Sequence, residues 1–148
     1  MNGRRVFFDT NIFVYALDLD EDARRRTAQT LLRWSANEGI GTFSYQVWQE
    51  FVHVSTRKFR VPATLDQTLQ AFHHFTGSLH IVHSSNALFT RAYQLWSRFQ
   101  FQWYDSLIVA AGVEAGCDVL YSEDLQDGLD IDDMRIVNPF KTSEAGLN

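Results

Sequence analysis

The sequence predicts an α/β sandwich with a mostly parallel central sheet. Segments that read as strands alternate with segments that read as helices along the 148 residues, which is the order that builds a parallel sheet. Residues 6–8 are a short run of purely apolar side chains, typical of a strand that helices cover on both faces. The run stops at Asp9, and ligands of such folds bind at the carboxyl ends of the strands.

The first half of the chain predicts helices that alternate with strands. After the first strand, residues 12–17 form one or two helical turns, and residues 23–36 carry apolar residues at helical spacing. Residues 40–43 are a second short strand. Ser44 is a suitable N-cap for a helix over residues 45–59.

The second half shows the same alternation. Its predicted helices span residues 63–75, 86–99 and 107–113, and its predicted strands span residues 80–83, 118–121 and 135–137. Leu65, Leu69 and Phe72 are expected to face inward from their helix. The helix over residues 107–113 is apolar nearly all round, as in a buried helix, and Gly116 is expected to end it.

The composition is that of one globular domain. Hydrophobic residues make up 45% and charged residues 21% of the chain, and we expect one domain over residues 1–140 and a loose C-terminal tail over residues 141–148. No apolar run approaches the roughly 20 residues of a membrane span, and no signal segment is apparent, so a cytoplasmic location is expected. The single cysteine, Cys117, is expected in the core.

The charge balance excludes little. A net charge of −5 argues against a protein that coats nucleic acid. It does not argue against a nucleic-acid enzyme whose acids bind metal, because each divalent ion reverses the local field.

Four acidic residues stand where the ends of the strands are expected to meet. Asp9 ends the first strand, Glu50 lies in the second turn of a helix, Asp105 opens the most apolar helix and Asp124 follows a later strand. Strand ends gather at one end of a parallel sheet, so these acids are expected to lie close together. Their repulsion requires a cation, and an oxygen-only site suits Mg²⁺ or Mn²⁺. The predicted chemistry is metal-dependent hydrolysis of phosphodiesters.

These acids lie in motifs that resemble those of PIN-domain nucleases, and most closely the VapC-type ribonuclease toxins of toxin–antitoxin pairs. In chain order the motifs are DTN (9–11), VWQEF (47–51), YDSLI (104–108) and SEDL (122–125). Each motif alone has low specificity, but the ordered set covers nearly the whole chain.

The resemblance implies a Rossmann-like three-layer α/β/α sandwich, endonuclease activity on RNA, a homodimer and a protein antitoxin that blocks the site. It assigns the catalytic, metal-binding acids to Asp9, Glu50, Asp105 and Asp124. It gives Asn11 and Ser122 a role in supporting these acids or orienting the substrate. Glu123 and Asp127 are close enough in sequence to compete with Asp124, so the fourth metal-binding residue stays open.

Other interpretations also remain. Taken singly, Asp9 and Asp105 could cap helices, Asp124 could belong to a turn and Glu50 could be an exposed helical residue. An aspartyl phosphatase needs a second aspartate at the position of Asn11, and a dinucleotide-binding domain needs a glycine-rich loop. The non-enzymatic alternative is a PIN-like module that binds RNA or protein without cleavage.

Basic and aromatic side chains offer weaker indications. Arg57 and Lys58, together with Arg60, could hold an RNA backbone beyond Glu50. The histidines lack the His-Glu-x-x-His spacing of a helical zinc site. The aromatic residues at positions 99–104 could stack on bases, but packing in the core or at a dimer interface is the expected role.

Overall fold

Six strands form one sheet in the computed structural model, which describes residues 4–141. Their order across the sheet is β3 (His80–Val82), β2 (Gly41–Ser44), β1 (Val6–Phe8), β4 (Val119–Tyr121), β6 (Met134–Val137) and β5 (Asp130–Ile131). All neighbouring pairs are parallel except β5 with β6. The mostly parallel sheet that the sequence predicted is therefore confirmed.

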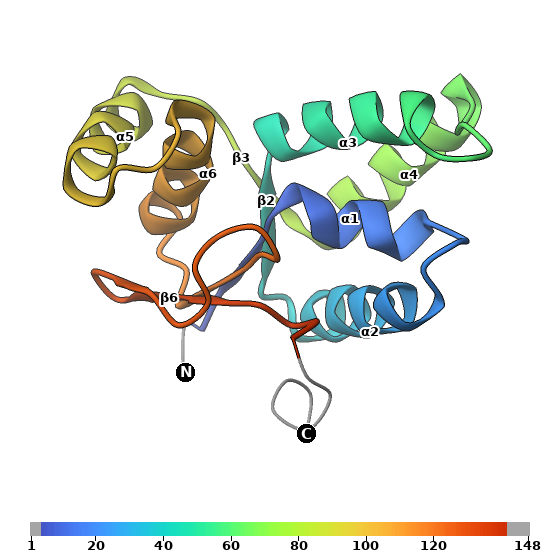
Figure 1. Cartoon of the computed structure of the whole chain (residues 1–148), viewed down its shortest axis with the longest axis horizontal. Helices are drawn as coiled ribbons and strands as arrows, with labels where there is room; N and C mark the ends of the chain where they lie inside the picture. Colours follow the sequence, from blue (N-terminus) through green and yellow to red (C-terminus); the bar gives the residue numbers. More distant parts are fainter. Residues whose placement is uncertain (1–3, 142–148) are drawn as a thin grey trace.

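Helices cover both faces of the sheet and make it the middle of three layers (Figure 1). On one side lie α5 (Asn86–Phe99) and α6 (Trp103–Glu114), and on the other α1 (Thr10–Leu17), α2 (Asp22–Glu38), α3 (Tyr45–Arg57) and α4 (Leu65–Ser78). Because both faces are covered, the three side chains of β1 are fully buried. The three-layer α/β/α sandwich is confirmed.

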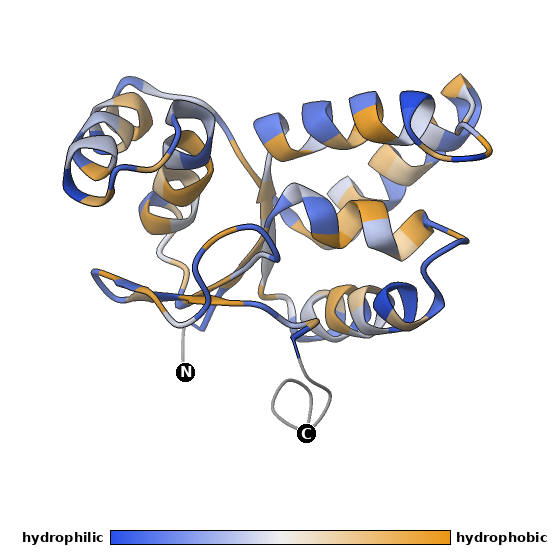
Figure 2. Cartoon of the chain, viewed as in Figure 1, coloured by the Kyte–Doolittle hydropathy of each residue, from blue (hydrophilic) through white to orange (hydrophobic). Residues whose placement is uncertain are grey.

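The apolar side of each amphipathic helix determines how the helix packs. In Figure 2 the hydrophobic side of α3 is turned toward α1 and its hydrophilic side away, and Val47, Trp48 and Phe51 are its large buried residues. Helix α6 is different, because all seven of its residues from Ser106 to Gly112 are buried. It packs between the sheet and α5, as its all-round apolar sequence predicted.

Two local expectations were wrong. Leu65 and Leu69 of α4 are 80% and 51% exposed, and Thr68 is the buried residue of this helix. The capping box of Thr64 and Gln67 starts the helix. The contact of α4 with α3 is small, so most of the first half of α4 faces solvent. The two-residue strand β5 was also missed, because a strand this short leaves no periodic signal.

The remaining fold expectations have mixed outcomes. Cys117 is buried, as predicted. The predicted tail starts at Lys141, whose ammonium lies 3.3 Å from the Asp127 carboxylate, but residues 142–148 lie outside the described residues. None of the helices within residues 4–141 combines the length and the apolarity that crossing a membrane requires.

The start of β2 allows no side chain at Gly41, which generates a stability prediction. A Cβ atom there would lie 2.5 Å from Leu79 Cδ2 and 2.5 Å from Ser35 Oγ, both in buried residues. Gly41→Ala should therefore lower the free energy of unfolding by about 1–3 kcal/mol in urea titrations. Gly77→Ala is the matched control on α4, where a Cβ meets nothing within 4 Å and should stabilise by about 0.5–1 kcal/mol. Equal effects of the two substitutions would contradict this account of the β2 packing.

Candidate functional site

Asp9 lies at the point where the order of strands reverses. Its strand β1 lies between β2, from which the sheet continues to β3, and β4, from which it continues to β6 and β5 in the other direction. The Asp9 amide donates to the Tyr121 carbonyl over 3.0 Å, so the carboxyl ends of β1 and β4 are tied together. Crevices at such a switch point are where open α/β sheets bind ligands.

The Asp9 carboxylate is both a helix cap and a buried acid. Its Oδ1 accepts a hydrogen bond of 2.7 Å from the Thr10 amide at the start of α1, and its Oδ2 accepts one of 2.7 Å from Ser122 Oγ. Only 8% of the residue is exposed. The capping role that seemed an alternative to a functional role is therefore compatible with it.

Burial raises the pKa of Asp9 to about 6, because desolvation disfavours the charged form. The hydrogen bonds from Ser122 and Thr10 lower the pKa but do not compensate, and the charges of Glu50 and Asp124 raise it further. An acid held in this way binds a cation readily, since the cation supplies the compensation that the protein lacks.

Glu50 faces Asp9 from the second turn of α3. Its Oε1 accepts a hydrogen bond of 2.8 Å from Thr10 Oγ1, and its Oε2 accepts one of 3.0 Å from Gln46 Nε2. Both oxygens are thus oriented by neutral donors, and no cationic side chain is paired with them within residues 4–141. The alternative of an unconstrained surface glutamate does not apply.

Asp105 lies in the first turn of α6, two residues after the helix begins at Trp103. It is not the N-cap, which is Gln102. Desolvation raises the pKa of Asp105, and the charges of Glu50 and Asp124 raise it further. Glu50 and Asp124 therefore interact electrostatically with both Asp9 and Asp105, although α6 covers the opposite face of the sheet from α3.

The fourth acid in the cluster is Asp124. Its Oδ2 accepts a hydrogen bond of 3.2 Å from Asn11 Nδ2, and its amide donates to Ser122 Oγ over 3.3 Å. Ser122 thus links Asp124 to Asp9, and Asn11 links it to the start of α1. Both residues that were predicted to support the acids contact them.

The Glu123 carboxylate already has two hydrogen-bond donors. It accepts hydrogen bonds from the Tyr15 hydroxyl over 2.5 Å and from Arg24 Nε over 2.8 Å. The Arg24 guanidinium also lies 5.3 Å from the centre of the Tyr15 ring. Asp127 is likewise committed, because it accepts from the Asn138 amide and from Lys141. The competing acids are paired, and Asp124 is left facing the site.

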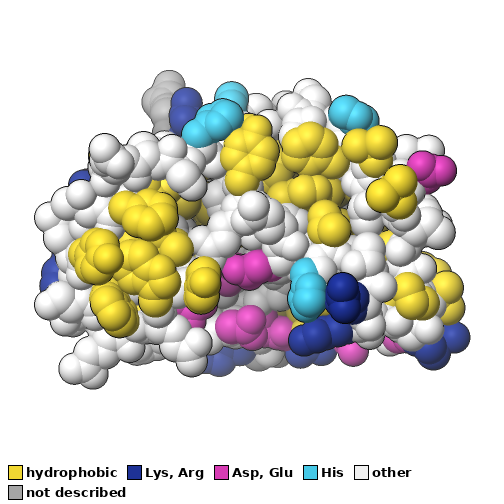
Figure 3. All heavy atoms as spheres, turned by 90° about the horizontal axis from the view of Figure 1, so that it is seen from above, with side chains coloured by type: hydrophobic (Ala, Val, Ile, Leu, Met, Phe, Trp, Pro, Cys, Tyr) yellow, Lys and Arg dark blue, Asp and Glu magenta, His cyan; other side chains and the backbone are white. Residues whose placement is uncertain are grey.

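A cleft of about 520 Å³ opens beside these acids, lined by residues that include Asn11, Glu50, His53 and Asp124. Figure 3 shows acidic side chains at the centre of one face, with a hydrophobic group on one side and histidine and basic side chains on the other. Arg57 and Lys58 end α3 beyond His53 and are exposed. Arg60 differs from them, because it pairs with Asp20 over 3.1 Å.

The donor set fits a hard divalent cation by its chemistry, since it consists of carboxylate oxygens around an acid that burial holds at a raised pKa. The carboxylates are, however, spread too widely to hold one ion in this arrangement. Among residues 4–141, no three side chains of Asp, Glu, His or Cys are grouped closely enough to ligate one ion as they stand. The acids have to approach one another further before three of them can share an ion.

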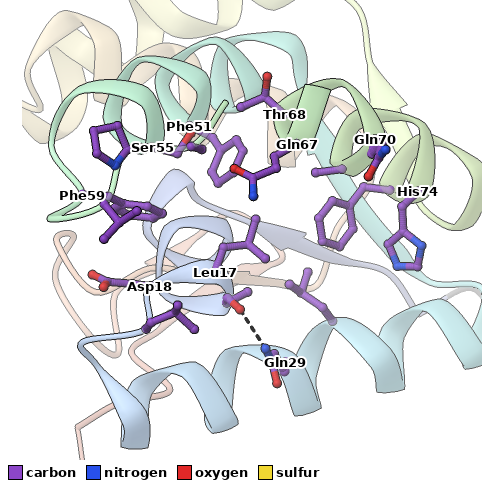
Figure 4. A pocket seen from close by; sticks show the side chains of 18 of the residues that line it. Leu17, Asp18, Gln29, Phe51, Ser55, Phe59, Gln67, Thr68, Gln70 and His74 are labelled. Carbon is purple, nitrogen blue, oxygen red and sulfur yellow. Dashed lines mark hydrogen bonds between the residues drawn. The ribbon is translucent and has the colours of Figure 1, made fainter. Parts of the chain in front are cut away.

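A second, larger cavity, the apolar groove, also borders α1. It has a volume of about 840 Å³ and lies between α1 and α2 on one wall and α3 and α4 on the other (Figure 4). Leu17, Phe51, Phe59 and Phe75 are among its apolar lining residues. Periodicity within single helices could not predict this groove, because it arises where four helices fail to close on one another.

An aromatic patch lies on α5 and the start of α6, made of the exposed Phe89, Tyr93 and Trp96 and the partly buried Trp103. The Trp103 ring lies 4.7 Å from that of Tyr93, 5.3 Å from that of Trp96 and 6.0 Å from that of Phe89. Tyr104, 68% exposed, joins the patch to Asp105. Trp103 was singled out in the sequence, whereas its partners on α5 were not.

A family model places the chain among known proteins. The model described as "PIN domain" matches residues 6–127, a span that contains all four acids of the cluster. No protein with curated annotation matches the chain significantly.

Solved structures of toxin–antitoxin proteins have a similar fold. A toxin–antitoxin complex from Klebsiella pneumoniae matches with a TM-score of 0.66 and 20% identity, covering 90% of this chain and 97% of that chain. VapC20 of Mycobacterium tuberculosis, described as a toxin that cleaves the sarcin–ricin loop, has a TM-score of 0.63 and 19% identity, with coverages of 80% and 89%. VapBC2 of Rickettsia felis, bound to a promoter DNA fragment, has a TM-score of 0.65 and 17% identity, with coverages of 88% and 96%. At these identities the likeness concerns the fold.

The raised pKa of Asp9 generates a prediction for the metal-free protein. Between about pH 4 and pH 6 the native state binds more protons at Asp9 than the unfolded state does, so the free energy of unfolding falls as pH rises through this window. Asp9→Asn removes this loss. In denaturant titrations with EDTA, the stability of Asp9→Asn relative to the wild type should rise by about 1.4 kcal/mol between pH 5 and pH 7.5.

Asp127→Asn is the control for this titration. The hydrogen bond from the Asn138 amide lowers the pKa of Asp127, so its charge does not change in that window. The stability difference between Asp127→Asn and the wild type should therefore stay constant from pH 5 to pH 7.5. A constant difference for Asp9→Asn as well would contradict the buried, hard-to-ionise state of Asp9.

Proposed function

The chain belongs to the PIN domain family, and from that premise we propose that it is a divalent-metal-dependent endoribonuclease, the toxin component of a toxin–antitoxin pair. One observation carries the proposal: acids from four separate segments gather at the switch point of the sheet, around a buried aspartate that no basic side chain of residues 4–141 pairs with. We propose further that residues 1–140 act as a single domain, in the cytoplasm.

In this proposal Asp9, Glu50, Asp105 and Asp124 hold Mg²⁺ or Mn²⁺. A bound ion of this kind lowers the pKa of its water and stabilises charge on phosphoryl oxygens. Carboxylate ligands alone, without histidine or thiolate, favour these two ions over zinc. The raised pKa of Asp9 supports the assignment, because an ionised buried carboxylate gains most from a neighbouring cation.

The neighbours of the acids have a supporting role. Ser122 donates to Asp9 Oδ2, and Thr10 donates to Glu50 Oε1, so each acid keeps one defined orientation. Asn11 orients Asp124 through its amide nitrogen. Fixing ligand orientations in advance reduces the reorganisation that binding a metal and a phosphodiester would otherwise need.

In this proposal the RNA backbone follows α3. Arg57 follows Glu50 by seven residues, two helical turns, and therefore lies on the same face of the helix. Lys58 is next to it, and both are exposed and free of ion pairs within residues 4–141. We propose that these two residues bind substrate phosphates adjacent to the acidic cleft.

A protein antitoxin is the proposed partner. Similar structures include toxin–antitoxin complexes, such as the one from Klebsiella pneumoniae. In this chain the groove of about 840 Å³ between α1, α2, α3 and α4 offers an apolar surface for a partner segment (Figure 4). Helices α1 and α3 line both this groove and the acidic cleft, so a segment seated in the groove would lie next to the site that it blocks.

We also propose a homodimer through the aromatic patch of Phe89, Tyr93, Trp96 and Trp103. Contiguous exposed aromatic side chains mark interaction surfaces in soluble proteins. The patch ends at Tyr104, so a second copy bound there would stand beside Asp105 and bring two acidic sites near each other.

The ribonuclease proposal predicts loss of activity when an acid of the cluster is neutralised. Asp105→Asn and Asp124→Asn should each lower the rate of cleavage of a fluorescent single-stranded RNA in Mn²⁺ by about 100-fold or more, since the lost stabilisation of the transition state amounts to several kcal/mol. Asp66→Asn, an exposed acid in the first turn of α4, is the control and should cleave at the wild-type rate. EDTA should abolish cleavage by every variant.

Other results would reassign the protein. If the wild type binds RNA but does not cleave it in Mg²⁺ or Mn²⁺, the chain is a binding module and the enzymatic proposal is wrong. If Asp127→Asn loses activity while Asp124→Asn retains it, the fourth acid has been misassigned.

The dimer proposal predicts a change of molar mass. Sedimentation of the wild type should give about twice 17.1 kDa, and Tyr93→Glu should give a single chain, because it buries a charge in the centre of the interface. Leu65→Glu, at an even more exposed apolar position on α4, should remain a dimer. A dimeric Tyr93→Glu variant would exclude this surface as the interface.

A further inference from the structure

Gln46 contacts Glu50 and the residue that precedes Asp105, and these two acids belong to different layers of the fold. It lies in the first turn of α3, one helical turn before Glu50. Its Nε2 donates to Glu50 Oε2 over 3.0 Å and to the Tyr104 carbonyl oxygen over 3.0 Å. Tyr104 is the residue that precedes Asp105 in α6, on the other side of the sheet from α3.

The chemistry of the two partners determines which way the amide points. A carboxylate oxygen and a peptide carbonyl are acceptors only, whereas an amide nitrogen carries two N–H donors. The nitrogen can satisfy both acceptors at once, and turning the amide over would place its oxygen against two others. The two hydrogen bonds therefore use the full donor capacity of one group.

Glu50 is held from both sides by this arrangement. Thr10 Oγ1 donates to its Oε1 over 2.8 Å, and Gln46 donates to its Oε2. Thr10 follows Asp9 in the chain, just as Tyr104 precedes Asp105. A continuous set of covalent and hydrogen bonds thus runs from Asp9 through Glu50 to Asp105.

We infer that Gln46 is a positioning residue of the site, which sets the separation of Glu50 and Asp105 across the end of the sheet. The inference rests on the proposed function, since it gives these two acids a shared metal. Gln46 acts through Glu50 and through the Tyr104 peptide and does not itself touch the substrate.

A neutral amide suits this task better than a charged side chain. A lysine or arginine at position 46 would compensate Glu50 and compete with a cation for it. The amide restrains the carboxylate without removing its charge, and it leaves the second lone pair of each oxygen free. Without it, Glu50 would regain rotamer freedom, and α3 and α6 would lose a direct link at the site.

The test compares two variants with wild type in three measurements: Mn²⁺ affinity by calorimetry, RNA cleavage in Mn²⁺, and thermal unfolding in EDTA. Gln46→Met keeps the length of the side chain and removes both donors. Gln46→Asn keeps the amide but is one methylene too short to reach both acceptors. Both variants should bind Mn²⁺ roughly 10- to 100-fold more weakly than the wild type, as loss of a residue that orients a metal ligand does.

The same variants should lower kcat for RNA cleavage while leaving KM for RNA and the unfolding temperature in EDTA close to wild type. Gln94→Met is the matched control, because Gln94 of α5 is exposed and makes no side-chain hydrogen bond within the part of the chain that the structure describes. It should match the wild type in all three measurements.

Three results would overturn the inference. Wild-type Mn²⁺ affinity in Gln46→Met and Gln46→Asn would show that Glu50 is positioned without Gln46. A loss of affinity that follows a comparable loss of stability in EDTA would make the role of Gln46 merely structural. If the wild type itself binds no Mn²⁺, the proposed function fails and the inference with it, whereas equal binding by wild type and variants removes the inference alone.

Discussion

The structure depends on the burial of one carboxylate at the end of its central strand. Asp9 follows three fully buried residues of β1 and is itself 8% exposed, so its charge has little access to water. Two hydrogen bonds, from Thr10 and Ser122, reduce the cost of this position but leave the pKa of Asp9 at about 6. A protein that maintains such an acid gives up stability near neutral pH, and a cation at the site would restore it.

Hydrogen bonds connect the segments next to this acid. The Thr10 hydroxyl donates to Glu50, and the Ser122 hydroxyl, in the loop after β4, donates to Asp9. Gln46 donates to Glu50 and to the Tyr104 carbonyl in α6. The loop after β4 is braced where Glu123 accepts from both Tyr15 and Arg24. Neutral donors hold Asp9, Glu50 and Asp124, whereas Glu123, which lines the same cleft, is paired with a cationic side chain. This division leaves the negative charge of the site uncompensated where a metal would bind.

The surface around the site is divided by chemistry. In Figure 3 the central acidic side chains lie between a hydrophobic group and a group of histidine and basic side chains. In the chain, Trp103 of the aromatic patch lies two residues before Asp105, Arg57 and Lys58 end α3, and α1 borders the apolar groove. Cleft and groove share α1 and α3 as walls, so a ligand in one is a neighbour of a ligand in the other. The acidic cluster therefore lies near two apolar surfaces of different chemistry, one aromatic and one a groove.

Sequence alone determined the fold class and the family, because these depend on local pattern: apolar runs of strand length, helical spacing and the order of the motifs. It also predicted the acids of the candidate site, from carboxylates at or near the ends of elements. At the fourth position the resemblance selects Asp124, but Glu123 and Asp127 compete in sequence, since the three lie within five residues of one another. Only the tertiary structure distinguishes their surroundings, because it shows the partners that come from other segments: Tyr15 and Arg24 for Glu123, and Asn138 and Lys141 for Asp127. The bridge through Gln46 is equally invisible in the sequence, where its two acceptors stand four and 58 residues away.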